Sequence, residues 1–440
     1  MYEGKPKELF RKYAIPQMIG LLFSSVYVIV DGIFIGNRLG RDAMAAAAVS
    51  VPVVEMLIAL SMAVASGSGV LISGQLGRGE KEKAVQTFNT AVICAAVMGV
   101  VIAAMGMVFL HPLARLLGST PQIHEQAVSY LRCIVVFSPF LVFSFLLGAL
   151  VRNDGRPKLA MFALAFGSVS NIVLDYVFMY PLNMGIVGAA LATAIGPVFS
   201  VMILLPHFIL KKGSLHFGKS TASFSDVGRI LKLGFPSFIM EFSIGIVTFI
   251  YNFAIVENGY GEIGLAAYLV IGYLMLIILT LFLGMAEGLQ PVFSYFAGVG
   301  KAERCNEMRR YAVKIFLAIG VVCYVLILLF SRYFFSIFSP DDIELINFTA
   351  GKSVVYFCGF FAAGYNILMI AYWQSAQNTK EALIISLLRS IVLTAIFAAV
   401  LPPLCGREAI WLCHSLSEAV TGCTAAALLR RRSRLDCASV

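Results

Sequence analysis

Charged side chains are scarce in this sequence. Of its 440 residues, 13% are Asp, Glu, Lys or Arg, whereas 60% are hydrophobic, and the mean hydropathy is +0.88. A soluble globular domain is about 25% charged and about 45–50% apolar, because water must solvate its surface. The deficit of charge therefore excludes an ordinary soluble protein and indicates a chain whose outer surface contacts lipid.

Several motifs that support chemistry are also missing. There is no G-x-x-x-x-G-K-[ST] loop, so the chain encodes no ATP-driven pump. Neither an H-E-x-x-H nor a C-x-x-C sequence occurs, the nine cysteines are scattered, and the five histidines are spread far apart without a clustered metal set. The sequence therefore predicts no enzyme activity and no cofactor.

Twelve segments are apolar enough to cross a bilayer. A spanning helix needs about 20 mainly apolar residues, and it must be helical because lipid cannot pair with backbone polar groups. The predicted spans are residues 14–36, 46–72, 88–110, 126–150, 158–180, 186–210, 232–256, 263–290, 312–331, 346–373, 382–402 and 408–429. The first is too long for the apolar region of a signal peptide and contains Asp31, so we interpret it as a span.

The net charge of +9 comes from Lys and Arg in the loops between these spans. The loops on one side carry 25 of these residues, and the loops on the other side carry Arg38, Arg41, Arg115, Arg332 and Arg407. Positively charged loops stay in the cytoplasm. We therefore predict a multi-pass protein of the inner (cytoplasmic) membrane with both termini cytoplasmic, and we expect no nucleic-acid partner.

The two halves of the sequence resemble each other. Residues 12–16 (KYAIP) match residues 232–236 (KLGFP), and residues 66–77 resemble residues 287–298. We predict an all-α integral membrane protein of twelve transmembrane helices in two pseudo-symmetric six-helix lobes. The lobes are residues 1–210 and 230–440, joined by a cytoplasmic linker at 211–229. Repeats of this kind place a substrate site between the lobes, near the midplane of the bilayer.

Acidic side chains within the spans are few, and each is a candidate functional group because a charge in hydrocarbon is costly. Asp31 shares a helix face with Tyr27, and Asp175 shares one with Asn171, since each pair is four residues apart. A buried carboxylate can hold a proton or, with other oxygen atoms nearby, bind a hard cation. The alternative is a structural hydrogen-bond network between the two helices.

Other intramembrane residues suggest substrate binding. Glu241 lies near the middle of its span with Phe238, Phe242 and Phe249, a setting that suits a cationic substrate, although a structural hydrogen bond is the alternative. The candidate substrate-binding residues are Glu241, Glu287 and Gln290. In the last two spans, we expect Arg389 or His414 to pair with Glu418.

Two prolines occupy matching positions in the first and seventh spans. Pro16 and Pro236 are candidate hinges, because a proline inside a helix removes a hydrogen bond and favours a bend. The alternative is a proline in the first turn, where it is harmless.

In order along the chain, several segments resemble the multidrug and toxic compound extrusion (MATE) transporters, and look closest to the MepA-like bacterial branch. They are residues 30–36 (VDGIFIG), 67–73 (GSGVLIS), 76–79 (LGRG), 138–140 (SPF), 152–158 (RNDGRPK) and 234–236 (GFP). The resemblance covers nearly the whole chain. It implies alternating access between two lobes and export driven by a proton or sodium gradient.

The resemblance also implies a cation-coupling site in the first half. Related transporters use side chains on helices 1, 5 and 6, and the matching positions here are Tyr27, Asp31, Asn171, Asp175 and Thr193. Asp31, Asn171 and Asp175 would bind the metal if the coupling ion is Na⁺. The span 346–373 lacks the Asp or Glu that some members place on helix 10, which leaves a second sodium site in doubt.

Taken together, the residues and the resemblance predict a secondary antiporter. We expect it to export small amphipathic, mainly cationic compounds in exchange for H⁺ or Na⁺, as a monomer in the lipid bilayer. Two alternatives stay open. One is a flippase for lipid-linked precursors, which would require a basic cavity. The other is a polytopic membrane enzyme, which would require a catalytic cluster at the membrane face.

Overall fold

The computed structural model describes residues 2–218, 224–336 and 342–438, and within these ranges it contains helices and no strand. The N-terminal half consists of α1 (Pro6–Leu39), α2 (Arg41–Gly77), α3 (Lys81–Val108), α4 (Leu110–Leu116), α5 (His124–Asn153), α6 (Pro157–Met179) and α7 (Gly185–Ile209). The C-terminal half consists of α8 (Phe224–Glu257), α9 (Gly261–Val299), α10 (Ala302–Ser336), α11 (Ile343–Phe357), α12 (Phe360–Ser375), α13 (Thr379–Leu387), the π-helix η1 (Leu388–Val392), α14 (Leu393–Cys405), the 3₁₀-helix η2 (Arg407–Leu412) and α15 (Cys413–Ala438).

These helices correspond to the predicted spans. Ten are individually long and apolar enough to cross a membrane, if residues 379–405 are taken as one helix, and the bent pair α11–α12 makes an eleventh span. The remaining long helix, α15, packs against α12 and α14. The all-α, multi-pass fold that the apolar segments predict is therefore confirmed. Of the predicted linker, residues 219–223 lie outside the described residues, residues 211–218 form a loop, and α8 begins at Phe224.

The sequence did not predict the break between α11 and α12. The two helices meet at an angle of 47° around Cys358 and Gly359. The Gly359 backbone N–H donates a hydrogen bond of 2.8 Å to the Ser415 hydroxyl of α15. A Cβ atom at this glycine would lie 2.6 Å from the Ser415 Cα, so the close approach of the two backbones requires glycine.

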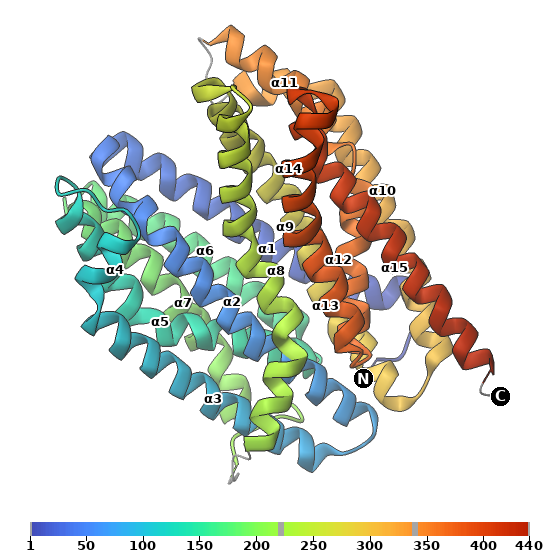
Figure 1. Cartoon of the computed structure of the whole chain (residues 1–440). Coiled ribbons are helices and arrows are strands. Elements are labelled where there is room, and N and C mark those ends of the chain that lie inside the picture. Colours follow the sequence, from blue (N-terminus) through green and yellow to red (C-terminus); the bar gives the residue numbers. More distant parts are fainter. Residues whose placement is uncertain (1, 219–223, 337–341, 439–440) are drawn as a thin grey trace.

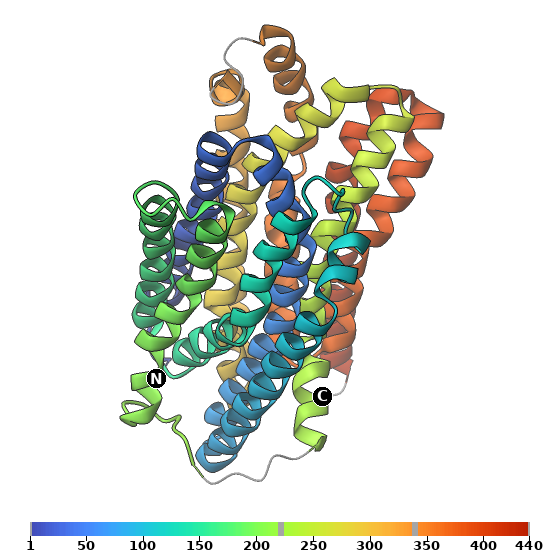
Figure 2. The same cartoon turned by 90° about the vertical axis from the view of Figure 1, so that its left-hand side faces the viewer.

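The two halves diverge from the end of the molecule that carries both termini. In Figures 1 and 2 this end, called the terminal end below, lies at the bottom, and the α2–α3 and α9–α10 connections lie there as well. The halves are joined mainly by α1 packed along α9 and by α2 packed along α8 and α9. We call this inter-half contact the seam.

Small residues bring the helix backbones together at the seam. A Cβ atom at Gly234 of α8 would overlap the backbone of Ala63 of α2, and one at Gly288 of α9 would overlap the backbone of Tyr13 of α1. Close backbone approach at small residues is a usual way to pack helices in lipid, where burial alone gives no driving force. These contacts lie toward the terminal end, so the seam closes that end in this structure.

The two candidate hinge prolines lie deep within their helices. Because α1 begins at Pro6 and α8 at Phe224, neither Pro16 nor Pro236 lies in a first turn. The harmless first-turn alternative is therefore wrong. That alternative assumed that each helix begins with its apolar stretch, whereas both helices begin earlier, in charged segments. The hinge role itself stays a prediction.

Candidate functional site

The structure brings the two candidate coupling acids together. Asp31 projects from α1 and Asp175 from α6, and these helices pack along each other. The two carboxyl groups lie close enough to influence each other. Asp175 is fully buried and Asp31 is partly buried.

The oxygen atoms at this site are mostly without partners. Both carboxyl oxygens of Asp175, one of Asp31 and the amide oxygen of Asn171 are buried and accept no hydrogen bond. Asn171 donates to the Thr193 hydroxyl of α7 at 3.5 Å, a long hydrogen bond. Buried polar atoms in folded proteins are nearly always paired. A cluster of bare oxygens is therefore suited to receive a proton or a hard cation.

Two tyrosines complete the site. Tyr27 of α1 lies near Ser24 and both acids. Tyr130 of α5 is buried and lies near Thr193 and both acids. The structure thus assembles all five predicted coupling residues and adds Tyr130. Local spacing did not single out Tyr130, because no acidic residue lies one turn away from it on its own helix.

Two small cavities lie between this site and the seam. One cavity of about 110 Å³ is lined by Tyr27, Asn171 and Thr193, and a second of about 50 Å³ is lined by Gln17, Arg152 and Glu287. The residues that line both cavities are Ser144, Phe145, Leu164 and Ser200. The two cavities therefore adjoin each other, one beside Tyr27, Asn171 and Thr193 and the other beside polar groups at the seam.

Two of the candidate substrate-binding residues lie in the seam. Glu287 of α9 accepts a 2.8 Å hydrogen bond from Gln17 of α1 and lies 3.6 Å from the Arg152 guanidinium of α5. Gln290 is buried and donates a 2.7 Å hydrogen bond to the Ser66 hydroxyl of α2. In this arrangement both side chains join the halves, and their role in substrate binding stays a prediction.

The third candidate, Glu241, lies apart from the acid site. It is partly buried on α8, where the charges of Glu55, Glu287 and Arg389 act on it. Phe235, Phe238 and Phe242 form a stacked series on the same helix, with ring centroids 5.8 and 5.5 Å apart. Phe249 is 71% exposed. Glu241 therefore shares its helix with a series of aromatic rings.

The C-terminal half holds a buried ion pair. Arg389 lies in the π-helix η1, and its Nε atom is 2.8 Å from Glu418 Oε1 of α15. Asn366 of α12 donates a 2.7 Å hydrogen bond to the other carboxylate oxygen, and His414 Nε2 is 3.9 Å away. Of the two partners expected for Glu418, Arg389 is the one that pairs with it closely.

The segment 152–158 also holds other parts of the chain in place. Asp154 is buried, lies 2.8 Å from His207 of α7 and accepts a 2.7 Å hydrogen bond from the Ser214 backbone. Tyr2 donates a 2.9 Å hydrogen bond to the Asn153 carbonyl. This turn therefore fastens both the N-terminus and the start of the linker to the N-terminal half.

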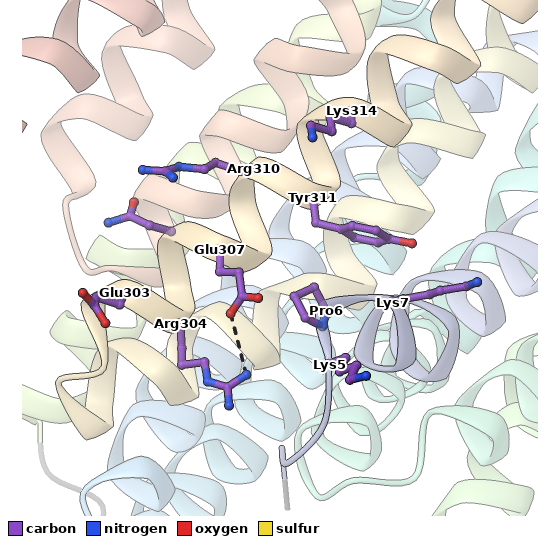
Figure 3. Close-up of a pocket in the computed structure, with 10 residues that line it drawn as sticks. Lys5, Pro6, Lys7, Glu303, Arg304, Glu307, Arg310, Tyr311 and Lys314 are labelled. Carbon is purple, nitrogen blue, oxygen red and sulfur yellow. Dashed lines mark ion pairs between the residues drawn. The ribbon is translucent and has the colours of Figure 1, made fainter.

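A charged groove of about 690 Å³ lies at the terminal end, between the start of α1 and α10 (Figure 3). Its basic lining residues are Lys5, Lys7, Arg304, Arg310 and Lys314. Glu307 pairs with Arg304 at 3.7 Å. The groove is remote from the acid site, and its excess of positive charge agrees with the predicted side of the Lys- and Arg-rich loops.

The fold and the site together define a polytopic helical membrane transporter with a buried acid pair, and not an enzyme. The MatE family model matches residues 16–177 and 236–400, and the chain belongs to this family. The two matched stretches begin at Pro16 and Pro236, the positions that the internal sequence repeat aligns.

Relatives and solved structures agree with this assignment. The multidrug export protein MepA of Staphylococcus saprophyticus is 26% identical over 422 residues, which cover 95% of this chain and 91% of that protein. MepA of Staphylococcus haemolyticus is 25% identical over 436 residues, 97% and 95% of the two chains. A crystal structure of MATE in the bent conformation superposes with a TM-score of 0.91 at 25% identity, covering 99% of this chain and 97% of that one. An outward-facing conformation of a multidrug resistance MATE family transporter gives 0.92 at 25% identity, covering 98% and 96%.

Proposed function

We propose that this chain is a secondary antiporter that exports small amphipathic, mainly cationic compounds in exchange for H⁺ or Na⁺. The names of the staphylococcal relatives, multidrug export proteins, support the class of substrate. The contact between Asp31 and Asp175 is the observation that carries the coupling mechanism.

Two facing carboxylates cannot both remain ionised at short distance without a positive charge between them. Within the described residues, no Lys, Arg or His forms an ion pair with either acid. The positive charge must therefore come from a mobile ion. A proton shared by the two carboxyls would satisfy the site, and so would Na⁺ bound by Asp31, Asp175 and the Asn171 amide oxygen.

Helix α1 connects this site to the seam. Asp31 lies in the half of α1 remote from the termini, whereas Gln17 lies in the terminal half, next to Pro16, and bonds to Glu287 of α9. A bend of α1 at Pro16 that follows ion binding would move Gln17 relative to Glu287. Ion occupancy would then favour one arrangement of the halves, which is the differential affinity that alternating access needs.

The buried charges favour a cationic substrate over a lipid phosphate. The negative charges of Glu55 and Glu287 both act on Glu241 of α8. The buried basic groups Arg152 and Arg389 are each paired with an acid. A flippase for lipid-linked precursors would instead need unpaired basic groups to meet the phosphate.

Transport by proteoliposomes tests this function. A fluorescent cationic dye should move across the membrane when a pH or sodium gradient is imposed, and the effective gradient identifies the ion. Asp42→Asn serves as a matched control, because Asp42 is an exposed acid that accepts a hydrogen bond from Gln122, away from the site. Dye movement that neither gradient changes would contradict the antiport mechanism.

The proposed topology places the terminal end in the cytoplasm of the inner membrane, with the chain acting as a monomer. Cysteines introduced singly at Lys5 and Glu262 in a cysteine-free background should differ in labelling by an impermeant maleimide added to whole cells. We expect labelling at position 262 and none at position 5. The reverse pattern would mean that the terminal end faces outward, and the proposed direction of transport would then be import.

A further inference from the structure

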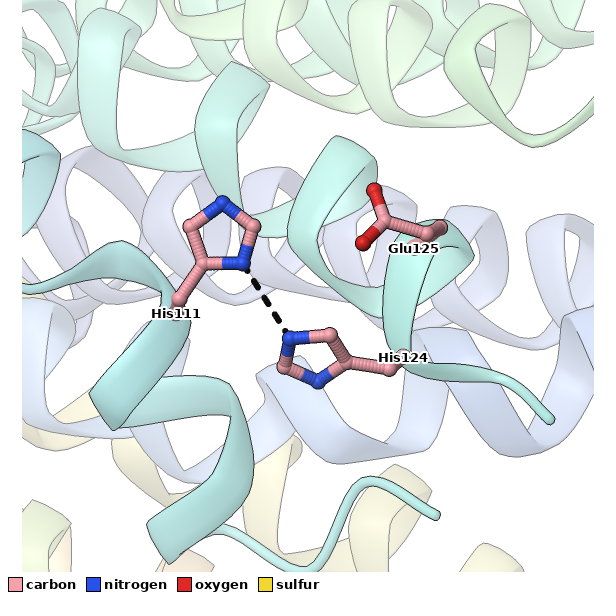
Figure 4. A group of neighbouring side chains, drawn as sticks. All are labelled: His111, His124 and Glu125. Carbon is pink, nitrogen blue, oxygen red and sulfur yellow. Dashed lines mark hydrogen bonds between the residues drawn. The ribbon is translucent and has the colours of Figure 1, made fainter. Parts of the chain in front are cut away.

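We propose that His111, His124 and Glu125 form a binding site for a divalent transition-metal ion, with Zn²⁺ as the preferred class (Figure 4). The sequence predicted that the five histidines lie far apart, and this is wrong for His111 and His124. His111 Nδ1 and His124 Nε2 lie 3.1 Å apart, because the chain turns back between α4 and α5. One ligand atom from each of the three residues lies within 4.8 Å of the others.

The two histidines are held by packed elements. His111 follows Leu110, which packs with Ala114 of α4 against Val128 and Leu131 of α5. His124 follows the buried Ile123. A metal site needs ligands that are fixed by their supporting structure, and these contacts fix the spacing of the two rings.

A third side chain orients one of the rings. The Ser119 hydroxyl lies 2.8 Å from His124 Nδ1. Histidines that bind metals usually engage their other ring nitrogen in such a hydrogen bond, which sets the ring orientation and leaves the ligating nitrogen free. Here the hydrogen bond directs Nε2 of His124 toward His111, as Figure 4 shows.

The distance between the nitrogens fits a shared metal ion. With Zn–N bonds of 2.0–2.1 Å and tetrahedral angles, two imidazole nitrogens are about 3.3–3.4 Å apart. The rings therefore need to separate only slightly to admit the ion. Glu125 is exposed, so its carboxylate is free to swing in as the third ligand, and water can complete the shell.

The ligand set selects the metal. Two imidazoles and one carboxylate suit Zn²⁺, Ni²⁺ or Cu²⁺, whereas Mg²⁺ and Ca²⁺ prefer oxygen alone. The site lies at the end opposite the termini, which is the outer side under the proposed topology. It is separate from the coupling acids, so the bound ion would be neither the coupling ion nor the exported compound.

Binding would clamp the α4–α5 turn against α2. Gln122, in the same turn, donates a 3.0 Å hydrogen bond to Asp42 at the start of α2, and Ile123 packs on Ala46 and Val49. An ion that joins His111 to His124 would hold this turn in place. We therefore expect Zn²⁺ to raise the thermal stability of the protein through binding to the folded state alone.

Calorimetry on the EDTA-stripped, full-length protein in detergent tests the site, with ZnCl₂ and MgCl₂ as titrants. Wild type should bind one Zn²⁺ saturably and show no Mg²⁺ binding at the same concentrations. The variants His111→Ala and His124→Ala should each lose more than about 100-fold in Zn²⁺ affinity. For Ser119→Ala we expect the smaller loss, about 10–100-fold, that is typical of a residue that orients a ligand. His216→Ala, a histidine at the terminal end, should bind like wild type.

Three results would overturn the proposal: no saturable Zn²⁺ binding, unchanged affinity in the His111→Ala, His124→Ala double variant, or equal losses in that variant and in His216→Ala. His111 is exposed, so its removal should not prevent folding, and the melting temperature of each metal-free variant checks this. None of these measurements depends on transport, so failure of the antiport mechanism would leave them unaffected.

Discussion

The two halves of the molecule solve the same electrostatic problem in different ways. In the N-terminal half, Asp31 and Asp175 face each other without a fixed positive charge. In the C-terminal half, Glu418 is paired at 2.8 Å with Arg389. Tyr251, which the internal repeat aligns with Asp31, is fully buried and lies near Glu418.

This difference indicates which half of the molecule can respond to an ion gradient. A buried carboxylate beside a permanent guanidinium is neutral as a pair, so it needs no ion from solution. Two facing carboxylates do need a positive ion, so their site has one state with the ion bound and another without it. We therefore expect the N-terminal half to respond to the gradient and the C-terminal half to remain electrostatically constant through the cycle.

The largest expected effect is the loss of coupling in the N-terminal half. Asp31→Asn and Asp175→Asn should each abolish gradient-driven dye transport, because an amide keeps the shape of a protonated carboxyl but cannot release the proton. Both variants should still fold and bind dye in detergent. The double variant should transport no less than either single one, since both changes remove the same site. Gradient-driven transport at the wild-type rate by both single variants would make these acids structural.

The next effect concerns stability in the C-terminal half. Arg389→Met leaves Glu418 buried without its partner, which should cost about 3–5 kcal/mol. The double variant Arg389→Met, Glu418→Met should recover most of that loss. The only two tryptophans of the chain, Trp373 and Trp411, are both buried in this half, so their fluorescence during thermal unfolding reports on it.

If Arg389→Met leaves the unfolding midpoint unchanged, the ion pair is not what balances the charge of this half. If Glu418→Gln instead removes the gradient dependence of transport, the C-terminal half also carries a coupling ion. Either result would break the asymmetry between the halves.

A smaller effect is expected at Glu241 of α8, in the C-terminal half. Glu241→Gln removes a charge that can pair with a cationic substrate, a contact worth about 1.5–3 kcal/mol, or about 10–100-fold in apparent affinity. Transport of neutral compounds should change less. Side-by-side assays with a cationic and a neutral dye measure the difference, and equal losses for both would assign Glu241 a structural role.

The sequence predicted the fold well because spanning helices leave a direct signal. Lipid requires long apolar segments and cytoplasmic loops collect Lys and Arg, so the spans could be placed without knowledge of packing. The acid site was also predictable, since Asp31 and Asp175 are rare charges within apolar runs. Their meeting required only that α1 and α6 pack together.

Other features depend on contacts between distant segments. Tyr130 and the His111–His124 pair acquire their surroundings from helices far apart or from a tight turn, which no local spacing reveals. The seam is a further example. Gln290 is predicted to bind substrate from its position in a span, and in the structure it is also buried against Ser66, a contact that only the packing of the two halves reveals.

The smallest expected effect tests the comparison at a single hydroxyl group. Tyr130→Phe removes a buried hydroxyl that lies near Thr193 and the two acids. A hydrogen bond from this hydroxyl to the ion-binding group would contribute about 0.5–1.5 kcal/mol, so the concentration of H⁺ or Na⁺ that half-saturates transport should shift by about two- to tenfold. Tyr251→Phe is the control in the other half, because it removes a buried hydroxyl where the acid Glu418 already has its fixed partner.

We expect Tyr251→Phe to leave the ion dependence of transport as it is in wild type, whatever it does to the maximal rate. Tyr251 stacks on Tyr268 with ring centroids 5.0 Å apart, and phenylalanine keeps that contact. The measurement is dye transport by proteoliposomes as a function of H⁺ or Na⁺ concentration. Only a site that exchanges its positive charge with solution should change its ion affinity when a neighbouring hydroxyl is lost. A shift for Tyr251→Phe as large as that for Tyr130→Phe would therefore mean that both halves respond to the ion.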